Sequence, residues 1–407
     1  MMIADLHIHS RYSRATSQEM IIPKIAEYAK LKGIGMVGTA DFTHPEWFKE
    51  LKRYLKQGDG VFEYGGVKFV LNVEVNNIYT RNGKLRRLHN IIFAPDFAIA
   101  EKINAYLDRY GRLASDGRPI ISLDTYDMSK ALLDLSPDIF LVPAHIWTPW
   151  FSLFGSNSGF DSIEECFADM KDRIFAMETG LSSDPAMNWR LSILDNYTLI
   201  SNSDAHSPTR LGREANVFRD ELNYFQLRDV LKNKDRTRFL YTIEFYPEEG
   251  KYHYDGHRKC NVRLSPKESR FNNNLCPVCS RSLTIGVLHR VESLGDREAG
   301  FVPDNSIPFK NLIPLEEIIA EAMSVGRDTV GVKNEYRRLV GIFGSEFEIL
   351  LNTPIEDLRN NTQERVALGV ERTRRGDLII KPGYDGEFGT VKIFEEQKST
   401  ESQMSLF

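Results

Sequence analysis

Cysteines and long apolar runs are both scarce in this sequence. Four cysteines among 407 residues are too few for the scaffold of a disulfide-rich secreted domain, and three of them lie within twenty positions. The apolar runs fall far short of the ~20 residues that span a bilayer. The first ten residues, MMIADLHIHS, already contain an acid and two histidines. We therefore expect a reducing compartment, no signal peptide and no membrane contact.

A large excess of charge of one sign is also lacking. The formal net charge of −5 excludes a uniformly basic surface of the kind that coats nucleic acid. Basic residues are concentrated instead: residues 250–290 contain eight lysines or arginines against two acids, and RNGKLRRLHN at 81–90 adds four basic residues and no acid. The remaining composition is that of a globular protein, and the length predicts two or three domains.

The first 220 residues repeat one pattern, in which a short apolar run is followed by a polar cluster and then by a stretch with helical periodicity. Because parallel strands need long crossovers that helices usually fill, this pattern predicts an α/β barrel over residues 1–245. The apolar runs are MIADLHIHS, GIGMVGTADF, KFVLNVEVNNI, LHNIIFAP, DIFLVPAHI, RIFAMETG and YTLISNSDAH.

The pattern changes after residue 245. Residues 246–290 are rich in turn formers and cysteine, which predicts a small metal-binding module. Residues 291–376 have helical periodicity, so we expect a helical domain there. Residues 377–407 are expected to form a hairpin with YDGEFG at its turn, followed by a flexible polar tail.

Histidines and carboxylates follow most of the apolar runs in the barrel region. His7 and His9 alternate along an expected strand, so both rings project to one side and can bind one metal ion. The carboxyl ends of barrel strands share one rim, where active sites of such folds lie. We expect nine residues to gather at this rim: His7, His9, Asp41, His44, Glu74, His89, His145, Asp204 and His206.

One such histidine is as easily explained by ordinary packing, but nine residues of metal-binding type at strand ends indicate two or three ions. A carboxylate such as Glu74 can bridge two ions, and a bridged site suits in-line displacement at phosphorus. The sequence therefore predicts a phosphoester hydrolase with Asp204, Glu74 and His9 as catalytic residues. We expect zinc, with magnesium or manganese as alternatives for catalysis. Glu178 either binds metal or orients a ligand histidine.

These motifs resemble the PHP (polymerase and histidinol phosphatase) family, whose pattern matches DLHIHS, TADFTH, LNVEV, PAH and NSDAH. The resemblance covers the first 220 residues and implies a distorted (β/α)7 barrel with a trinuclear metal site. The sequence departs from the family at RYSRATS and at Phe42, which leaves Asp41 or His44 as substitute ligands. The ligands that the resemblance implies are His7, His9, Glu74, His89, His145, Asp204 and His206.

A second metal site is indicated by His257, Cys260, Cys276 and Cys279. They form two pairs, each with two residues between its members. This spacing is typical of a closed tetrahedral zinc site, which folds a module that has little core of its own. His253, one turn earlier in KYHYDGH, is the alternative fourth ligand.

Basic residues surround the expected zinc ligands, together with the aromatic residues Tyr252, Tyr254 and Phe271. Cations bind phosphates and rings stack on unpaired bases, so the mixture is typical of nucleic-acid binding. A solvated basic face explains the composition equally well, but beside a phosphoesterase barrel we expect nucleic acid. The basic residues in question are Arg258, Lys259, Arg263, Lys267, Arg270 and Arg281.

A PHP-type barrel followed by GKYHYDGHRKC, LCPVC, TIGVLHRVESL and KPGYDGEFG resembles the endonuclease Q family over nearly the whole chain. The resemblance implies a DNA repair endonuclease of the bacterial or archaeal cytoplasm, associated with the nucleoid. Its implied substrate is double-stranded or single-stranded DNA, cleaved 5′ to deoxyuridine, deoxyinosine, deoxyxanthosine or an abasic site.

Two other functions are compatible with part of the sequence. A small-molecule phosphatase of the histidinol phosphatase kind shares the barrel, but it has no use for a basic zinc module. A non-catalytic DNA-binding protein would have lost the ligand residues, which are all present.

Two further features lie outside the metal sites. Aromatic residues near the expected ligands either stack on a base or pack in the core; they are Tyr79, Trp147, Trp150, Phe151 and Phe154. The C-terminal ESQMSLF resembles a truncated sliding-clamp-binding motif with Gln403, Leu406 and Phe407 as its anchors. We therefore expect a sliding clamp as a second partner.

Overall fold

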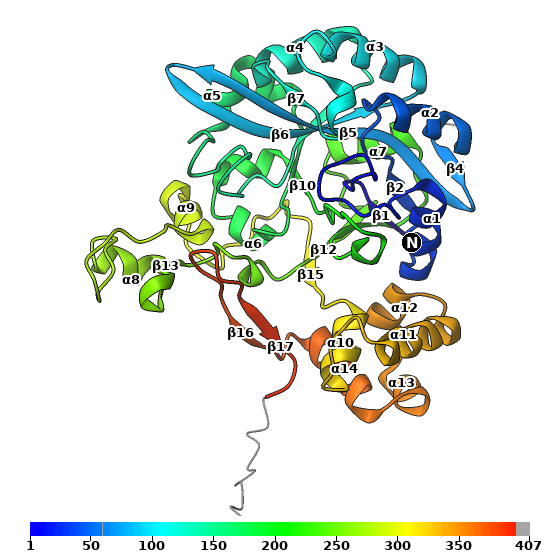
Figure 1. The fold of residues 1–407 in the computed structure, drawn as a ribbon, viewed down its shortest axis with the longest axis vertical. Coiled ribbons are helices and arrows are strands. Elements are labelled where there is room, and N and C mark those ends of the chain that lie inside the picture. Colours follow the sequence, from blue (N-terminus) through cyan, green and yellow to red (C-terminus); the bar gives the residue numbers. More distant parts are fainter. Residues whose placement is uncertain (59, 396–407) are drawn as a thin grey trace, which may run out of the picture.

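The computed structural model describes residues 1–58 and 60–395 (Figure 1). The expected clamp-binding residues Gln403, Leu406 and Phe407 lie outside the described residues. Within the described part of the chain, no helix is both long and apolar enough to cross a membrane.

The expected distorted (β/α)7 barrel is confirmed. Hydrogen-bonded pairing runs from β1 through β2, β5 and β6 to β8, and β9 pairs with β10. The ring closes at the carboxyl ends, where Ile146 N donates to Glu178 O at 3.0 Å and Ile8 bridges Ala205. The ring strands are β1 (Met2–Asp5), β2 (Met36–Gly38), β5 (Val67–Arg81), β6 (Lys84–Ala94), β8 (Phe140–Pro143), β9 (Ala176–Glu178) and β10 (Thr198–Ile200).

Further strands extend the sheet and helices cover the outside of the ring (Figure 1). The additional strands are β3 (Lys56–Gln57), β4 (Phe62–Tyr64), β7 (Ile120–Ile121), β11 (Ala215–Phe218) and β12 (Phe239–Glu244). The helices are α1 (Ile22–Lys32), α2 (Pro45–Tyr54), α3 (Phe97–Leu107), α4 (Thr125–Leu135), α5 (Ile163–Phe167), α6 (Pro185–Asn188) and α7 (Tyr224–Lys232).

The expected alternation of strands and helices is wrong between residues 67 and 94. Here β5 and β6 form one long antiparallel hairpin, in which residues 71–81 pair with residues 84–94. The strands are joined by Asn82 and Gly83, with φ of 52° and 73°. Positive φ at both turn residues matches the twist of the flanking strands, and Asn-Gly is the preferred pair. Glu74 therefore lies inside a strand rather than at its end.

The inward face of β5 changes in character from the base of the barrel to its rim. Side chains alternate along a strand, so Val70, Asn72, Glu74 and Asn76 share one face. Val70 packs in a buried apolar cluster with Phe93 and residues of β1, β8 and α7. From Asn72 onward this face of β5 is therefore polar, and Glu74 lies above the apolar cluster that fills the base of the barrel.

Residues 245–313 leave the barrel and return to it. They include β13 (Asp255–His257), β14 (Val262–Leu264), α8 (Pro266–Phe271) and α9 (Val287–Leu294), which project to one side in Figure 1. Strand β15 (Phe309–Asn311) then pairs in parallel with β12 of the main sheet. The helical periodicity expected from residue 291 thus becomes a continuous helical domain only from Leu315, because this return strand intervenes.

The helical domain packs beside α1, and a hairpin follows it (Figure 1). Its helices are α10 (Leu315–Ala322), α11 (Val330–Phe343), α12 (Glu346–Leu351), α13 (Ile355–Asn361) and α14 (Glu364–Arg375). Strands β16 (Ile379–Lys381) and β17 (Thr390–Lys392) pair in antiparallel fashion, and their connecting turn reaches β13.

Candidate metal centre

Glu74 joins two groups of histidines inside the barrel. Its side chain is 0% exposed, and its two oxygens face different partners. Oε2 lies 3.3 Å from His9 Nε2, while Oε1 lies 2.7 Å from His89 Nδ1 and 3.0 Å from His145 Nε2. A carboxylate placed in this way has the geometry of a bridge between two metal ions.

The first group consists of His7, His9 and Asp204, whose ligand atoms lie within 4.8 Å of one another. His7 Nε2, His9 Nε2 and Asp204 Oδ1 are buried and have no hydrogen-bond partner among the described residues. Buried polar atoms are rarely left unpaired, so three converging on one point fit a metal ion. Burial raises the pKa of Asp204, but His9 and His7 outweigh it and hold the pKa well below its usual range.

The second group consists of Glu74, His89 and His145. Burial lowers the pKa of His89 to about 4, so its ring is neutral near pH 7 and has a lone pair to offer. A metal ligand must be unprotonated, and His89 meets that requirement. Burial lowers the pKa of His145, but Glu74 outweighs it and raises the pKa above its usual value. His89 Nδ1 and His145 Nε2 lie 3.2 Å apart, which is close enough for both nitrogens to bind the same metal ion.

Glu178 lies behind His7 rather than in either group. Both of its oxygens are 3.0 Å from His7 Nδ1, and it also accepts hydrogen bonds from His145 N and Asn202 Nδ2 at 2.8 Å. This contact orients the ring so that Nε2 faces the first group. A carboxylate that fixes the tautomer of a ligand histidine is a common support in metal sites.

Asp41, His44 and His206 lie outside the two groups. Asp41 Oδ1 is 3.4 Å from His9 Nδ1, and its other oxygen accepts from Ser10 N at 2.8 Å. The His44 ring stacks on Tyr12 at a centroid distance of 4.3 Å. The His206 ring lies 4.5 Å from His9 and donates from Nδ1 to Asp204 O at 2.8 Å. Of the three, Asp41 and His206 contact the first group and His44 does not.

Four of the expected ligands lie beyond the ends of the regular strands rather than within them. His7 and His9 follow β1 on an extended segment, whereas Asp204 and His145 have φ of 48° and 30°. Asp41 likewise has φ of 46°. Non-glycine residues are uncommon in this left-handed region, and their clustering at one site shows that the surrounding fold imposes the conformation.

Arg118 is a site residue that the sequence reasoning missed. Its Nη1 donates to Glu74 Oε2 at 3.2 Å, and its side chain is 25% exposed. Two hydrogen bonds hold the segment in place: Gly117 N donates to Tyr12 O at 2.9 Å, and Asn76 N donates to Pro119 O at 3.0 Å. A Cβ on Gly117 would lie 2.2 Å from Asp41 Oδ2, so only glycine allows this approach.

Buried polar side chains below the metal groups were also missed. Asp5 accepts from Gly212 N at 2.9 Å, and Asn202 Oδ1 accepts from Leu6 N at 2.8 Å and Asn216 Nδ2 at 2.9 Å. These bonds tie the ends of β1, β10 and β11 together. In the sequence these residues are visible only as single polar residues within apolar runs. In the structure their hydrogen bonds give the ligands a rigid support.

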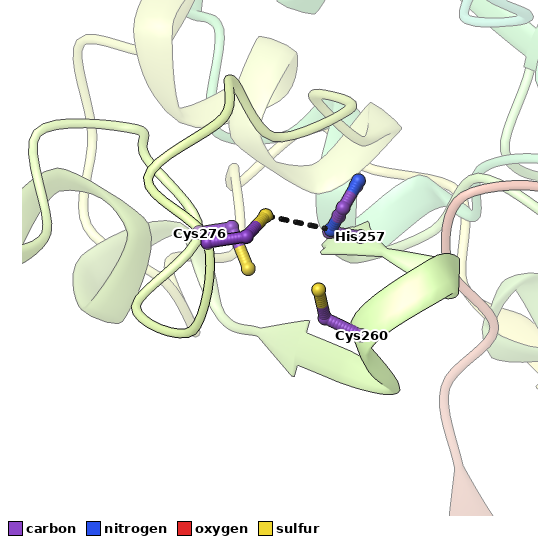
Figure 2. A group of neighbouring side chains, drawn as sticks. His257, Cys260 and Cys276 are labelled. Atoms are coloured by element: carbon purple, nitrogen blue, oxygen red, sulfur yellow. Dashed lines mark hydrogen bonds between the residues drawn. The ribbon is translucent and has the colours of Figure 1, made fainter.

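The four expected zinc ligands come together in the projecting module. His257, Cys260, Cys276 and Cys279 have ligand atoms within 4.8 Å of one another, and Figure 2 shows the first three converging. Cys279 Sγ lies 3.5 Å from His257 Nδ1. Burial raises the pKa of the Cys276 thiol, but N–H groups of Cys279 and Val278 outweigh it and lower the pKa to about 7. This donor set fits a closed zinc site.

The zinc module has little apolar core. Its buried apolar cluster consists of Val262, Cys276 and Leu283, with Cys260 and Leu264 packed against it. His253, the alternative ligand, stacks on Tyr254 and lies outside the group. So small a core is typical of modules whose folding depends on a bound metal ion.

The six basic residues expected to bind DNA are all exposed. Arg258 and Arg263 contact the hairpin turn, through Asp385 and through the Pro382 carbonyl. Arg270 forms an ion pair with Glu292. Lys259, Lys267 and Arg281 have no ion-pair partner within the part of the chain that the structure describes, so their charges face solvent.

Comparison with known proteins gives matches along the whole chain. The family model of the MJ0043 C-terminal domain matches residues 314–377. MJ0043 from Methanocaldococcus jannaschii is 34% identical over 260 residues, which are 62% of this chain and 32% of that protein. The chain thus spans about a third of the length of this relative.

Two solved structures match more completely. The lesion-specific endonuclease PfuEndoQ from Pyrococcus furiosus has a TM-score of 0.86 and 34% identity, covering 97% of this chain and 96% of its own. A complex of endonuclease Q with a 27-mer duplex that has an abasic lesion at the active site has a TM-score of 0.85 and 34% identity, covering 99% and 100%. With a third of the positions identical across nearly the full length of both chains, the protein belongs to the endonuclease Q family.

Proposed function

We propose that the protein is a metal-dependent DNA repair endonuclease that cuts the phosphodiester bond 5′ to deaminated bases and abasic sites. The observation that carries the proposal is Glu74, whose two oxygens face two separate groups of ligand atoms. The solved complex of endonuclease Q with an abasic duplex supports DNA as the substrate class.

Each of the two groups would bind one metal ion. His7, His9 and Asp204 would hold one ion, and His89 with His145 would hold another, with Glu74 shared between them. When bound, the ions supply Lewis acidity that activates water near neutral pH and offsets charge at phosphorus. Glu178 keeps the His7 ring oriented, and Asp41 contacts the far side of the His9 ring.

Arg118 supplies donors beside the metal groups. One N–H of its guanidinium is used on Glu74, and within the described residues its side chain makes no other hydrogen bond. A guanidinium has five N–H donors in a fixed plane that matches phosphate oxygens. The remaining donors of Arg118 bind a non-bridging oxygen of the scissile phosphate and stabilise the charge that develops there.

The lesions that we propose are deoxyuridine, deoxyinosine, deoxyxanthosine and the abasic site. The reacting phosphate has to reach ligands that are buried within the barrel, such as His9 at 0% exposure, so the nucleotide must leave the helix. Damaged pairs are cheaper to open, which favours them as substrates. The exposed cations of the zinc module bind the flanking backbone.

The experiment is cleavage of end-labelled duplexes that contain one lesion each, beside an undamaged duplex of the same sequence. We expect incision 5′ to the lesion that depends on added zinc, magnesium or manganese, and no incision of the undamaged duplex. An Asp204→Ala variant, folded as judged by circular dichroism, should be inactive. Phosphate release from small esters without DNA incision would contradict the proposal and favour a small-molecule phosphatase.

A further inference from the structure

A series of contacts between aromatic residues from distant parts of the sequence leads from the metal centre to the β16–β17 turn. Phe151 packs on the ligand His89 at a centroid distance of 5.1 Å. Its neighbour Trp150 meets Tyr252 edge to face at 5.4 Å, and the Tyr252 hydroxyl lies against Gly386 in the β16–β17 turn. Phe388 follows in the same turn. We name Trp150, Tyr252 and Phe388 the aromatic strip.

Two members of the aromatic strip are more exposed to solvent than residues of an apolar core. Phe388 is 72% exposed and Trp150 is 41% exposed. By contrast, the neighbouring Trp147 and Phe154 are both buried in the main core and pack on each other. Packing therefore explains Trp147 and Phe154, but it leaves most of Phe388 and much of Trp150 in water.

The charge around the aromatic strip is positive. The Lys251 ammonium lies 4.4 Å from the Phe388 ring centroid, and Arg87 lies 5.5 Å from that of Phe151. The acids of the turn are already engaged, since Asp385 accepts from Arg258 N and Thr284 Oγ1. Glu387 faces Arg258 at 3.7 Å. Exposed rings flanked by cations are complementary to the bases and phosphates of a nucleic acid.

The position of the aromatic strip is fixed by backbone contacts. Gly386 N donates to Lys251 O at 3.0 Å, and Tyr254 N donates to Gly383 O at 2.9 Å. Figure 1 shows the hairpin running up beside β13, below α6. The strip is therefore built on a supported turn, and its rings can hold one place relative to the metal centre.

We propose that the aromatic strip stacks on bases left unpaired when the lesion nucleotide leaves the helix, and so keeps the duplex open. This inference rests on the proposed function and extends it to a second binding surface. A nucleotide drawn toward Glu74 and His89 leaves unpaired bases next to the cut. Trp150 follows Phe151, which packs on His89, and Tyr252 and Phe388 continue from Trp150 toward the β16–β17 turn, so the aromatic strip offers ring faces that suit any base.

The test compares paired with pre-opened substrates. Phe388→Ala and Trp150→Ala should slow cleavage of a lesion in a fully paired duplex by about 10- to 100-fold, the range for loss of one base stack. The same variants should lose less than about 3-fold on a duplex whose bases flanking the lesion are already mismatched, because opening is then supplied by the substrate. A 2-aminopurine opposite the lesion should show weaker fluorescence change with the variants.

The controls separate this inference from the proposed function. Phe225 on α7 is 39% exposed and lies outside the aromatic strip, so Phe225→Ala should cleave both substrates like the wild type. Zinc content and circular dichroism verify the fold of each variant. If the wild type cuts lesions but Phe388→Ala and Trp150→Ala match it, or lose activity equally on both substrates, the role of the strip is disproved while the endonuclease stands. An inactive wild type would instead contradict the proposed function.

Discussion

Lys32 Nζ lies 2.6 Å from Glu346 Oε2, and both side chains are only 5% exposed. The pair joins α1 of the barrel to α12 of the helical domain. Tyr336 OH and Leu315 N also donate to the Glu346 carboxylate, at 2.8 Å and 3.1 Å. A single buried carboxylate thus receives donors from the barrel and from two further helices, which fixes the helical domain against the barrel.

The first prediction concerns this pair. Lys32→Met leaves a buried anion without its cation and should lower the free energy of unfolding by about 3–5 kcal/mol. Adding Glu346→Gln removes the charge, so the double variant should be more stable than Lys32→Met alone. Urea denaturation measures both. As a control on the same helix, Lys24→Met removes the exposed pair with Glu27 and should leave the free energy of unfolding nearly unchanged. A double variant less stable than Lys32→Met would refute the argument.

The second prediction concerns Glu178, which orients His7. Glu178→Gln weakens the contact with His7 Nδ1 that fixes the tautomer of the ring, so the metal affinity of the barrel should fall about 10- to 100-fold. Activity should recover when more metal is added, because the ligands themselves remain. The metal concentration for half-maximal cleavage measures the effect. The exposed Glu101→Gln should leave it unchanged, and a loss of activity that metal cannot restore would argue against a purely orienting role.

The third prediction concerns Arg118. Arg118→Ala should reduce kcat about 10²- to 10³-fold at saturating metal, the usual effect of removing one donor to a developing oxyanion. Single-turnover cleavage measures the loss. Arg112 is exposed and lies six residues earlier, which makes Arg112→Ala a matched control. A normal rate with Arg118→Ala would exclude contact with the scissile phosphate.

The fourth prediction concerns pH and Glu244, which is fully buried in β12. Burial raises the pKa of Glu244 to about 8. Between pH 4.5 and that value, the folded state keeps a proton that the unfolded chain has lost, so stability falls as pH rises. The slope is at most about 1.4 kcal/mol per pH unit for one proton. Relative to the wild type, Glu244→Gln should therefore become more stable as pH rises. A difference in the free energy of unfolding between the two proteins that is the same at all pH values would contradict the prediction.

The fifth prediction concerns the zinc module. Cys276→Ser should remove one zinc ion and expose residues 250–290 to trypsin, because the module has a core of three buried apolar residues. Zinc analysis and limited proteolysis measure this. Cys166 is buried in α5 and does not belong to the group of zinc ligands, so Cys166→Ala should keep the zinc. Unchanged protease resistance after zinc loss would show that the module folds without metal.

Residue type and local spacing were enough to predict part of this site. His257, Cys260, Cys276 and Cys279 carry their spacing in the sequence, and His7, His9 and Glu74 stand out as ligand types in apolar runs. The barrel followed from the same runs. The Asn82-Gly83 hairpin was missed because its signal lay between two runs that also suit a βα unit.

Other parts of the site could not be predicted, since they depend on contacts between distant segments. Arg118 reaches Glu74 only because β7 pairs with β5, with Ile120 opposite Asn76. The aromatic strip combines residues 150, 252 and 388, which no local pattern connects. An isolated arginine or phenylalanine carries no signal of this kind in the sequence.

The left-handed backbone of Asp41, His145 and Asp204 sets a limit on how this protein can be improved. Glycine adopts that conformation without the penalty that side chains meet, so glycine at these positions would relieve strain while it removes the carboxylate or imidazole. At Asp204, whose Oδ1 has no hydrogen-bond partner among the described residues, activity and heat resistance therefore favour different residues. Glycine there would give a more stable protein that has lost an expected metal ligand, whereas at Asp41 it would also remove the acceptor of the Ser10 N–H.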